Sequence, residues 1–361
     1  MSAELEKNIG AAQAQAEAYQ DQIRRQKEQT ADTTMAEFSR DIAPLPRNQM
    51  RVRRVLKGHS NKVYSVNWAQ DSSSLVTASQ DGKMIVWDPM SADKEYAITL
   101  RSSWVMCSAY SPSRKMVACG GLDNACSLYD LSKVDEAMAN TKNGIPDIAP
   151  TKEFIGHIGF IASARFLSDS ELLTCSGDTT CIMWDVERAI PKITFKGHTA
   201  DVMNLALLAD RTNPGSANTF VTVGCDATAR VWDIRSGQCT RIYVGHDSDI
   251  NAVDSFPNGV AFATGSDDHS CRMYDLRADR EMMRFIKPEM SSCVTSVSFS
   301  KSGRALFVAY DDTNVIAWDT LKATQSGVLA AHEERVSSLA VSPDGSALAT
   351  ASWDSMVKIW A

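Results

Sequence analysis

The sequence predicts an all-β fold, a propeller of seven blades, with an α-helix before it, and two observations carry this prediction. An aspartate stands six residues before an aromatic residue seven times, at intervals of 42 to 55 residues. Between these marks, short alternating segments such as 63–68 and 75–79 are typical of strands, with a tight turn at 80–83. A repeat of this length with short strands throughout is typical of propeller blades.

The seven marks are followed by Asp in six cases, as in Trp87-Asp88, and a histidine precedes five of them, four times after glycine. This combination is the WD-repeat pattern, and it extends over residues 51–361. The aspartate–aromatic pairs are Asp81/Trp87, Asp123/Tyr129, Asp178/Trp184, Asp226/Trp232, Asp268/Tyr274, Asp312/Trp318 and Asp354/Trp360. The histidines are His59, His157, His198, His246 and His332.

These repeated polar residues are interpreted as structural. A histidine and an aspartate can hydrogen-bond in series with a strand hydroxyl and the indole, and buried polar groups require such partners. The hydroxyls expected are those four residues before each aspartate: Thr77, Thr174, Thr222, Thr264 and Thr350. A set repeated in almost every blade is too regular for a catalytic triad, and no Gly-x-Ser-x-Gly motif or phosphate loop accompanies it. The sequence therefore indicates neither an enzyme nor a cofactor or metal site.

Closure of the ring is also predicted. The chain ends one residue after Trp360, at the third strand of the last repeat, and the strand-like segment 51–56 precedes the first repeat. We expect that segment to pair into the last blade and remove its exposed edge.

The N-terminal segment, 1–45, is predicted to be helical and separate from the propeller at 46–361. Apolar residues step by four and three, as in one half of a coiled coil. A second short helix is expected between the capping box Thr34-x-x-Glu37 and Pro44. A solvated tail remains the alternative, because so short a helix needs a partner. The seam residues are Leu5, Ile9, Ala12, Ala16, Tyr19 and Ile23.

Composition excludes several classes of protein. The net charge of −7 argues against a nucleic-acid surface, and no apolar run approaches the length of a membrane span. The nine cysteines are scattered and never spaced Cys-x-x-Cys, which is typical of reduced thiols in a cytoplasmic protein.

One face of the propeller stands out. The loop after each histidine and the turn with each aspartate must lie at the same end of the blades, so aligning the repeats with one another shows which residues vary there. The third residue after the histidine position is Lys62, Trp104, Phe160, Asp201, Asp249, Cys293 or Arg335. The residue before the aspartate is Gln80, Leu122, Gly177, Cys225, Asp267, Asp311 or Trp353. Aromatic residues, methionines and a few charges in one patch indicate a protein-binding surface.

A heptad helix joined to a seven-bladed WD propeller whose second blade reads LRSSWVM at 100–106 resembles the β subunits of heterotrimeric G proteins. QMRVRRVLKGH at 49–59 and SWDSMVKIW at 352–360 also match that family. The resemblance implies an obligate, prenylated γ subunit on the N-terminal helix and a GDP-bound α subunit on the varied face. It also implies receptor and effector partners, and a cytoplasmic protein held at the inner face of the plasma membrane only through lipidated partners.

By position, the family's α-contacting residues correspond here to Lys62, Tyr64, Lys83, Ile85, Lys94, Trp104, Met106, Leu122, Asn124, Phe160, Asp201, Met203, Cys225, Asp249, Asn251, Asp267 and Trp353. Three positions depart from the family pattern: Ser60 stands where Leu is usual, Ile158 where Thr is, and Phe160 where Tyr is. Two insertions, 133–151 and 209–219, are expected as surface loops on the opposite face. Another WD scaffold, such as a ribosome-associated or ubiquitin-ligase adaptor, remains the alternative.

Overall fold

The computed structural model describes residues 15, 18, 19, 21, 22, 25, 35–47, 49–134, 149–209, 217–287 and 291–361. The chain divides into two compact units, Met1–Ala43 and Pro44–Ala361. In the first unit the described part of 15–25 is helical, and α2 spans Met35–Phe38. Among the described residues no helix is long and apolar enough to cross a membrane.

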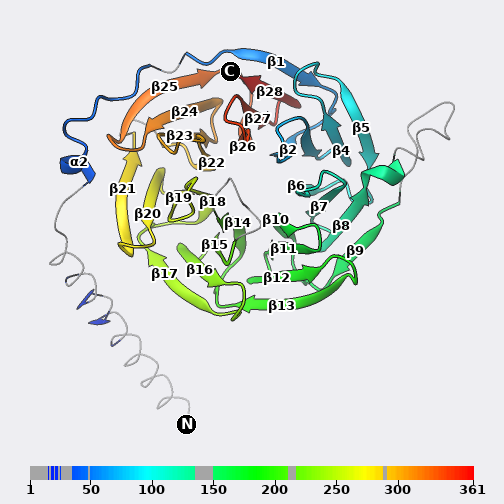
Figure 1. Ribbon diagram of the computed structural model, residues 1–361, viewed down its shortest axis with the longest axis horizontal. Coiled ribbons are helices and arrows are strands. Elements are labelled where there is room, and N and C mark those ends of the chain that lie inside the picture. The colour runs from blue at the N-terminus through cyan, green and yellow to red at the C-terminus, as the bar shows by residue number, and fades with distance from the viewer. Residues whose placement is uncertain are drawn as a thin grey trace, which may run out of the picture. The chain divides into compact units, whose positions relative to one another are not determined.

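The second unit is a seven-bladed propeller, and each blade is an antiparallel sheet of four strands around a central axis (Figure 1). Blade 1 contains β2 (Val63–Trp68), β3 (Leu75–Ser79), β4 (Lys83–Trp87) and β5 (Lys94–Thr99). Blade 2 contains β6 (Val105–Tyr110), β7 (Met116–Gly121), β8 (Ala125–Asp130) and β9 (Lys152–Ile155). Blade 3 contains β10 (Ile161–Ser168), β11 (Glu171–Ser176), β12 (Thr180–Asp185) and β13 (Ile190–Lys196).

The remaining blades follow the same order from the axis outward. Blade 4 contains β14 (Val202–Leu208), β15 (Thr219–Gly224), β16 (Thr228–Asp233) and β17 (Cys239–Val244). Blade 5 contains β18 (Ile250–Ser255), β19 (Ala261–Ser266), β20 (Ser270–Asp275) and β21 (Arg280–Ile286). Blade 6 contains β22 (Val294–Phe299), β23 (Ala305–Tyr310), β24 (Asn314–Asp319) and β25 (Thr324–Ala330).

Blade 7 closes the ring with strands from both ends of the propeller unit. It contains β26 (Val336–Val341), β27 (Leu348–Ser352), β28 (Met356–Trp360) and, as its outer strand, β1 (Val52–Lys57). Arg51 and Ala361 exchange backbone hydrogen bonds at the end of this ladder, and the C-terminus lies beside β1 in Figure 1. The outer strand therefore comes from the segment that the sequence predicts.

The core lies between neighbouring blades. Val76, Met84 and Ile98 of blade 1, for example, pack in one buried cluster with Val105 and Tyr129 of blade 2. The two middle strands of a blade, such as β3 and β4, are almost entirely buried and continuously apolar, whereas an outer strand such as β13 is mostly exposed.

The two insertions join β8 to β9 and β14 to β15, at the end of the blades opposite the aspartate turns. Residues 135–148 and 210–216 of them lie outside the described residues, as does Thr34 of the capping box. In the coiled-coil seam only Tyr19 is described; it is helical and exposed. Leu5, Ile9, Ala12, Ala16 and Ile23 lie outside the described residues, so the seam stays a prediction.

Candidate functional site

In five blades a histidine, an aspartate and a threonine form a hydrogen-bonded chain. In blade 1, His59 Nδ1 lies 3.1 Å from Asp81 Oδ2, and His59 Nε2 lies 2.8 Å from Thr77 Oγ1. The Trp87 indole N–H donates to the same hydroxyl at 2.8 Å. The corresponding residues of the other four blades are His157, Asp178, Thr174 and Trp184; His198, Asp226, Thr222 and Trp232; His246, Asp268 and Thr264; and His332, Asp354, Thr350 and Trp360. We call each such chain a staple.

Burial and hydrogen bonding shift the pKa values of staple residues such as Asp81 and His157. Burial alone would raise the pKa of Asp81, but hydrogen bonds from His59 and from the N–H groups of Ser60 and Lys83 outweigh it and lower the pKa to about 2. Burial lowers the pKa of His157 and outweighs the opposing attraction of Asp178. The His59 side chain is 1% exposed. Groups so enclosed serve folding, because no substrate can reach them.

Blades 2 and 6 lack the staple. In blade 2, Arg101 takes the histidine position, is exposed, and lies 3.3 Å from Glu153, while Asp123 is also exposed. In blade 6, Val308 stands where the threonine is found elsewhere. The indole N–H of Trp318 there is buried, and no acceptor at hydrogen-bond geometry meets it among the described residues. Burial raises the pKa of Tyr310, against a small opposing effect of that indole, so the two rings are close even though their polar atoms are poorly aligned.

The histidine loops and aspartate turns lie at one end of the blades, which we call the turn face. In all seven blades the N–H of the residue before the aspartate donates to the carbonyl of the third residue after the histidine position, at 2.9 to 3.0 Å. The paired residues are Lys62/Gln80, Trp104/Leu122, Phe160/Gly177, Asp201/Cys225, Asp249/Asp267, Cys293/Asp311 and Arg335/Trp353. The two sets of positions that differ most among the repeats are therefore neighbours in space.

The fifth residues after the histidine positions form a second ring of side chains, which surrounds the propeller axis. These residues all line an axial cavity of about 420 Å³: Tyr64, Met106, Ala162, Met203, Asn251, Thr295 and Ser337. Three of them bind a carbonyl of the next blade: Asn251 donates to Val294 O at 3.2 Å, Thr295 to Val336 O at 2.6 Å, and Ser337 to Val63 O at 2.5 Å. Polar members of this ring thus join neighbouring blades, whereas Tyr64, Met106 and Met203 are half-buried side chains at the mouth of the cavity.

Apolar side chains are exposed on blades 2 and 3 of the turn face. Trp104 is 46% exposed, Leu122 48% and Ile158 87%. The Asn124 side chain bridges the two blades by donating to Ile158 O at 3.3 Å, and Phe160 is half-buried beside it. We call Trp104, Leu122, Ile158 and Phe160 the apolar sector. Exposing side chains of this size is costly unless a partner covers them.

Blades 4 to 6 carry an acidic sector, formed by Asp201, Asp249, Asp267 and Asp311. Two thiols in this sector have raised pKa values, to which the aspartates contribute after burial. Burial, with Asp249, Asp201 and Asp267, raises the pKa of Cys225 to about 12. Burial, with Asp267 and Asp311, raises that of Cys293 to about 11. Both thiols are protonated at neutral pH and are poor nucleophiles.

Blades 7 and 1 carry a basic aromatic sector. The Lys62 ammonium lies 3.7 Å from the centre of a Trp353 ring, and the Arg335 guanidinium lies 5.1 Å from it. Tyr64 meets the same indole edge-on, with 6.2 Å between ring centres. The turn face therefore carries three chemically distinct sectors around one axis.

Most of the residues predicted to bind a partner lie on this face, with two exceptions. Ile85 is 1% exposed and packs in the core between blades 7 and 1 with Leu56, Val63 and Val357, so its side chain is buried in this chain and its role as a contact stays a prediction. Lys94 begins the outer strand β5 at the opposite end of blade 1, and its ammonium lies beside Gly58 and 5.7 Å from the centre of a Trp87 ring.

Sequence reasoning missed two features of the site. Ile158 was noted only as a departure from the family pattern, although it is the most exposed large apolar side chain of the apolar sector. Arg335 and Asp311 complete the basic and acidic sectors, and both stand in the aligned positions that the repeats already mark. Among the described residues no group of three His, Cys, Asp or Glu side chains could hold a metal ion.

Comparison with known proteins gives a consistent answer over nearly the whole chain. Residues 5–361 match the family model described as G protein beta WD-40 repeat protein. The guanine nucleotide-binding protein subunit beta of Oryza sativa subsp. japonica is 39% identical over 380 residues, covering 99% of this chain and 97% of that protein. Subunit beta-5b of Danio rerio is 43% identical over 332 residues, covering 91% of this chain and 81% of that protein.

Proposed function

The chain belongs to the family of G protein β subunits, and from that premise we propose that its turn face is the surface that changes partners during signalling. As a member of this family the chain is a non-catalytic WD-repeat propeller that works within a heterotrimer. In the proposal, the turn face binds a GDP-bound α subunit and, after the α subunit takes up GTP, binds effectors instead.

One observation carries the proposal: the turn face places the exposed apolar sector between an acidic and a basic sector. Apolar groups surrounded by charges are typical of an interface centre with a polar rim. The sectors also constrain orientation, because a partner must offer cations to Asp201, Asp249 and Asp267 and anions to Lys62 and Arg335.

The N-terminal segment is proposed to form a coiled coil with a γ subunit. The sequence places apolar residues in a seam from Leu5 to Ile23, and Tyr19 of that seam is helical and 57% exposed. A partner helix would cover Tyr19. Because no helix among the described residues is apolar enough to span a membrane, we propose that lipid on the partner subunits holds the assembly at the inner face of the plasma membrane, in the cytoplasm.

The test is the substitution Trp104→Ala, measured by titration calorimetry against an α subunit loaded with GDP. Because the indole is 46% exposed, its removal leaves the fold intact, and we expect binding to weaken by about 2 kcal/mol or more. Met90→Ala is the matched control, since Met90 is 77% exposed at the opposite end of blade 1. Unchanged affinity in Trp104→Ala, or an equal loss in Met90→Ala, would contradict the proposal that the turn face binds the α subunit. The same α subunit loaded with a GTP analogue should not bind either variant or the parent protein.

A further inference from the structure

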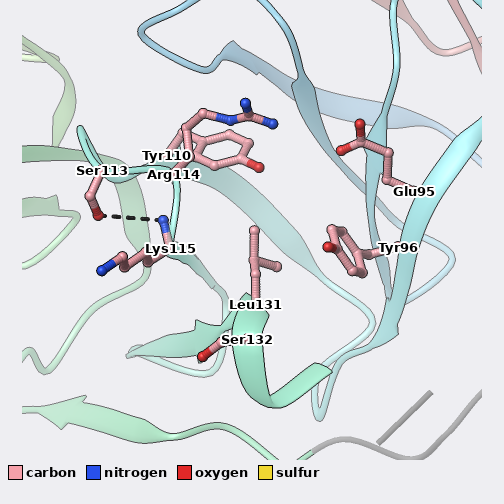
Figure 2. A pocket seen from close by; sticks show the side chains of 8 residues that line it. All are labelled: Glu95, Tyr96, Tyr110, Ser113, Arg114, Lys115, Leu131 and Ser132. Carbon is pink, nitrogen blue, oxygen red and sulfur yellow. Dashed lines mark hydrogen bonds between the residues drawn. The ribbon is translucent and has the colours of Figure 1, made fainter. Parts of the chain in front are cut away.

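A cavity of about 640 Å³ lies between blades 1 and 2 at the end of the blades opposite the turn face. Its walls come from the start of β5, the turn between β6 and β7, and the residues that follow β8. Figure 2 shows the lining side chains: Glu95, Tyr96, Tyr110, Ser113, Arg114, Lys115, Leu131 and Ser132. The proposed α-subunit and effector contacts do not use it.

The guanidinium at the rim is already neutralised. Arg114 Nη1 lies 2.8 Å from Asp71 Oδ2, and Arg114 Nη2 donates to Ser74 Oγ at 2.8 Å. The Ser74 hydroxyl in turn donates to Glu95 Oε2 at 3.1 Å. One cation therefore lies between two carboxylates, which leaves one negative charge at this rim.

The rest of the lining adds negative charge. Ser113 N–H donates to Asp169 at 3.1 Å, and the Ser132 hydroxyl donates to Asp130 at 2.6 Å. The Lys115 ammonium points away from Tyr96 and Leu131 (Figure 2). Among the described residues, the charged side chains that line the cavity or form the bonds given above are four acidic and two basic, so the cavity favours a cation.

The aromatic side chains define the shape of that cation. Tyr96 and Tyr110 stand on opposite sides of the cavity with Leu131 between them, and Glu95 lies beside them at the rim (Figure 2). Aromatic rings near a carboxylate attract an organic cation, and an apolar floor accepts the methylene stem of a long basic side chain. The volume exceeds what one such side chain fills, which leaves room for the neighbouring residues of a peptide.

We propose that this cavity binds an arginine or lysine side chain presented by a partner protein, with the cationic group at Glu95 and the stem against Leu131 and the tyrosines. The site is independent of the turn face, so it can be occupied whether or not an α subunit is bound.

The full-length protein is titrated with the capped tripeptide Gly-Arg-Gly and with the same peptide carrying citrulline, which has the shape of arginine without its charge, followed by ligand-observed NMR. We expect the arginine peptide to bind roughly tenfold more tightly than the citrulline peptide. Equal affinity for the two peptides would overturn the proposal. Tetramethylammonium is a third probe, and binding as tight as that of the arginine peptide would overturn the assignment to a peptide side chain.

Variants separate the cavity from the rest of the surface. Glu95→Gln keeps an acceptor for Ser74, and it should lose most of the preference for arginine over citrulline. Glu171→Gln is the matched control, because Glu171 is a half-buried glutamate that pairs with Lys192 at 2.8 Å in blade 3. Trp104→Ala should bind the peptide normally, so that this test and the α-subunit test can fail separately. An unchanged preference in Glu95→Gln, or an equal loss in Glu171→Gln, contradicts the proposal.

Discussion

Blade 4 and blade 2 have the same four strands, but they are held together differently at the turn face. In blade 4 the His198 loop is bound to the Asp226 turn at 2.9 Å and to Thr222 at 2.7 Å, and all three side chains are inside the blade. In blade 2 the corresponding Arg101 and Asp123 are exposed. Blade 2 nevertheless keeps the backbone bond between loop and turn, Leu122 N–H to Trp104 O at 3.0 Å.

The difference shows which part of the repeat makes the blade and which part is free to vary. The backbone bond is present in all seven blades and positions loop against turn. The staple adds stability but requires a buried histidine and aspartate in the same loop and turn. Blade 2, without it, presents two of the four apolar-sector side chains, Trp104 and Leu122.

Blade 6 shows that losing the staple does not by itself create a binding patch. It lacks the threonine, but the aligned loop and turn residues are Cys293, which is small and half-buried, and Asp311, which is charged. The missing threonine destabilises the inside of blade 6, where the buried Trp318 indole N–H lacks a well-aligned acceptor among the described residues. The apolar sector therefore does not follow from loss of the staple, because blade 3 keeps its staple and still presents Ile158 and Phe160.

The largest expected effect comes from replacing the repeat aspartate of blade 4 with alanine, and the same replacement in blade 2 is the comparison. Asp226→Ala leaves His198 and the N–H groups of Thr199 and Thr228 without their acceptor inside the protein, so we expect a loss of about 3 kcal/mol in the free energy of unfolding. Asp123→Ala removes an exposed side chain, and it should change that free energy by less than about 0.5 kcal/mol. Urea unfolding measures both values. Similar losses in the two variants would remove the distinction between stapled and unstapled blades.

Acid should weaken the staples in two stages, the first carried by His157 of blade 3 and the second by Asp81 of blade 1. The lowered pKa of His157 means that the unfolded chain binds that proton more tightly, so stability present above pH 6.5, the ordinary value, is lost as the pH falls below it. The pKa of Asp81, lowered to about 2, contributes about 2 kcal/mol above pH 4, and this contribution is lost as the pH falls towards 2.

Unfolding by urea across this range tests the second stage. Between pH 4 and pH 2, the free energy of unfolding of Asp81→Asn should fall by about 2 kcal/mol less than that of the parent protein, because the variant has no carboxylate to protonate there. Asp123→Asn is the matched control in the unstapled blade and should follow the parent curve. A parent-like curve for Asp81→Asn would show that the staple does not carry this dependence.

The repeat pattern predicted the blades, their closure by 51–56 and the common position of loops and turns, because each depends on local spacing repeated seven times. It could not tell which varied residues are exposed. The positions of Tyr64 and Ser337 are equivalent in the repeat, yet Ser337 bonds to the next blade while Tyr64 packs on Trp353. That outcome depends on the neighbouring blade, more than 40 residues away in sequence or at the other end of the chain.

The burial of Ile85 has the same cause. The family resemblance marks Ile85 as a contact, but β4 lies between β3 and β5, and a neighbouring blade covers its side chain. The cavity between blades 1 and 2 was not predicted from the sequence. Tyr96 and Tyr110 belong to different blades, and neither stands at a marked position of the repeat.

The smallest expected effect comes from building part of the staple into blade 6. This change is also the most direct test of the staple. Val308 stands ten residues before Trp318, as Thr222 stands ten before Trp232, whose indole donates to that threonine at 2.7 Å. Val308→Thr should therefore give the Trp318 N–H an acceptor and raise the free energy of unfolding by up to about 1 kcal/mol, since the new bond offsets the burial of a hydroxyl. Thr222→Val, the reverse change in blade 4, should cost at least as much, because it leaves both the Trp232 N–H and His198 Nε2 unpaired. A loss of stability in Val308→Thr would mean that the Tyr310 ring, and not a missing hydroxyl, determines how Trp318 packs.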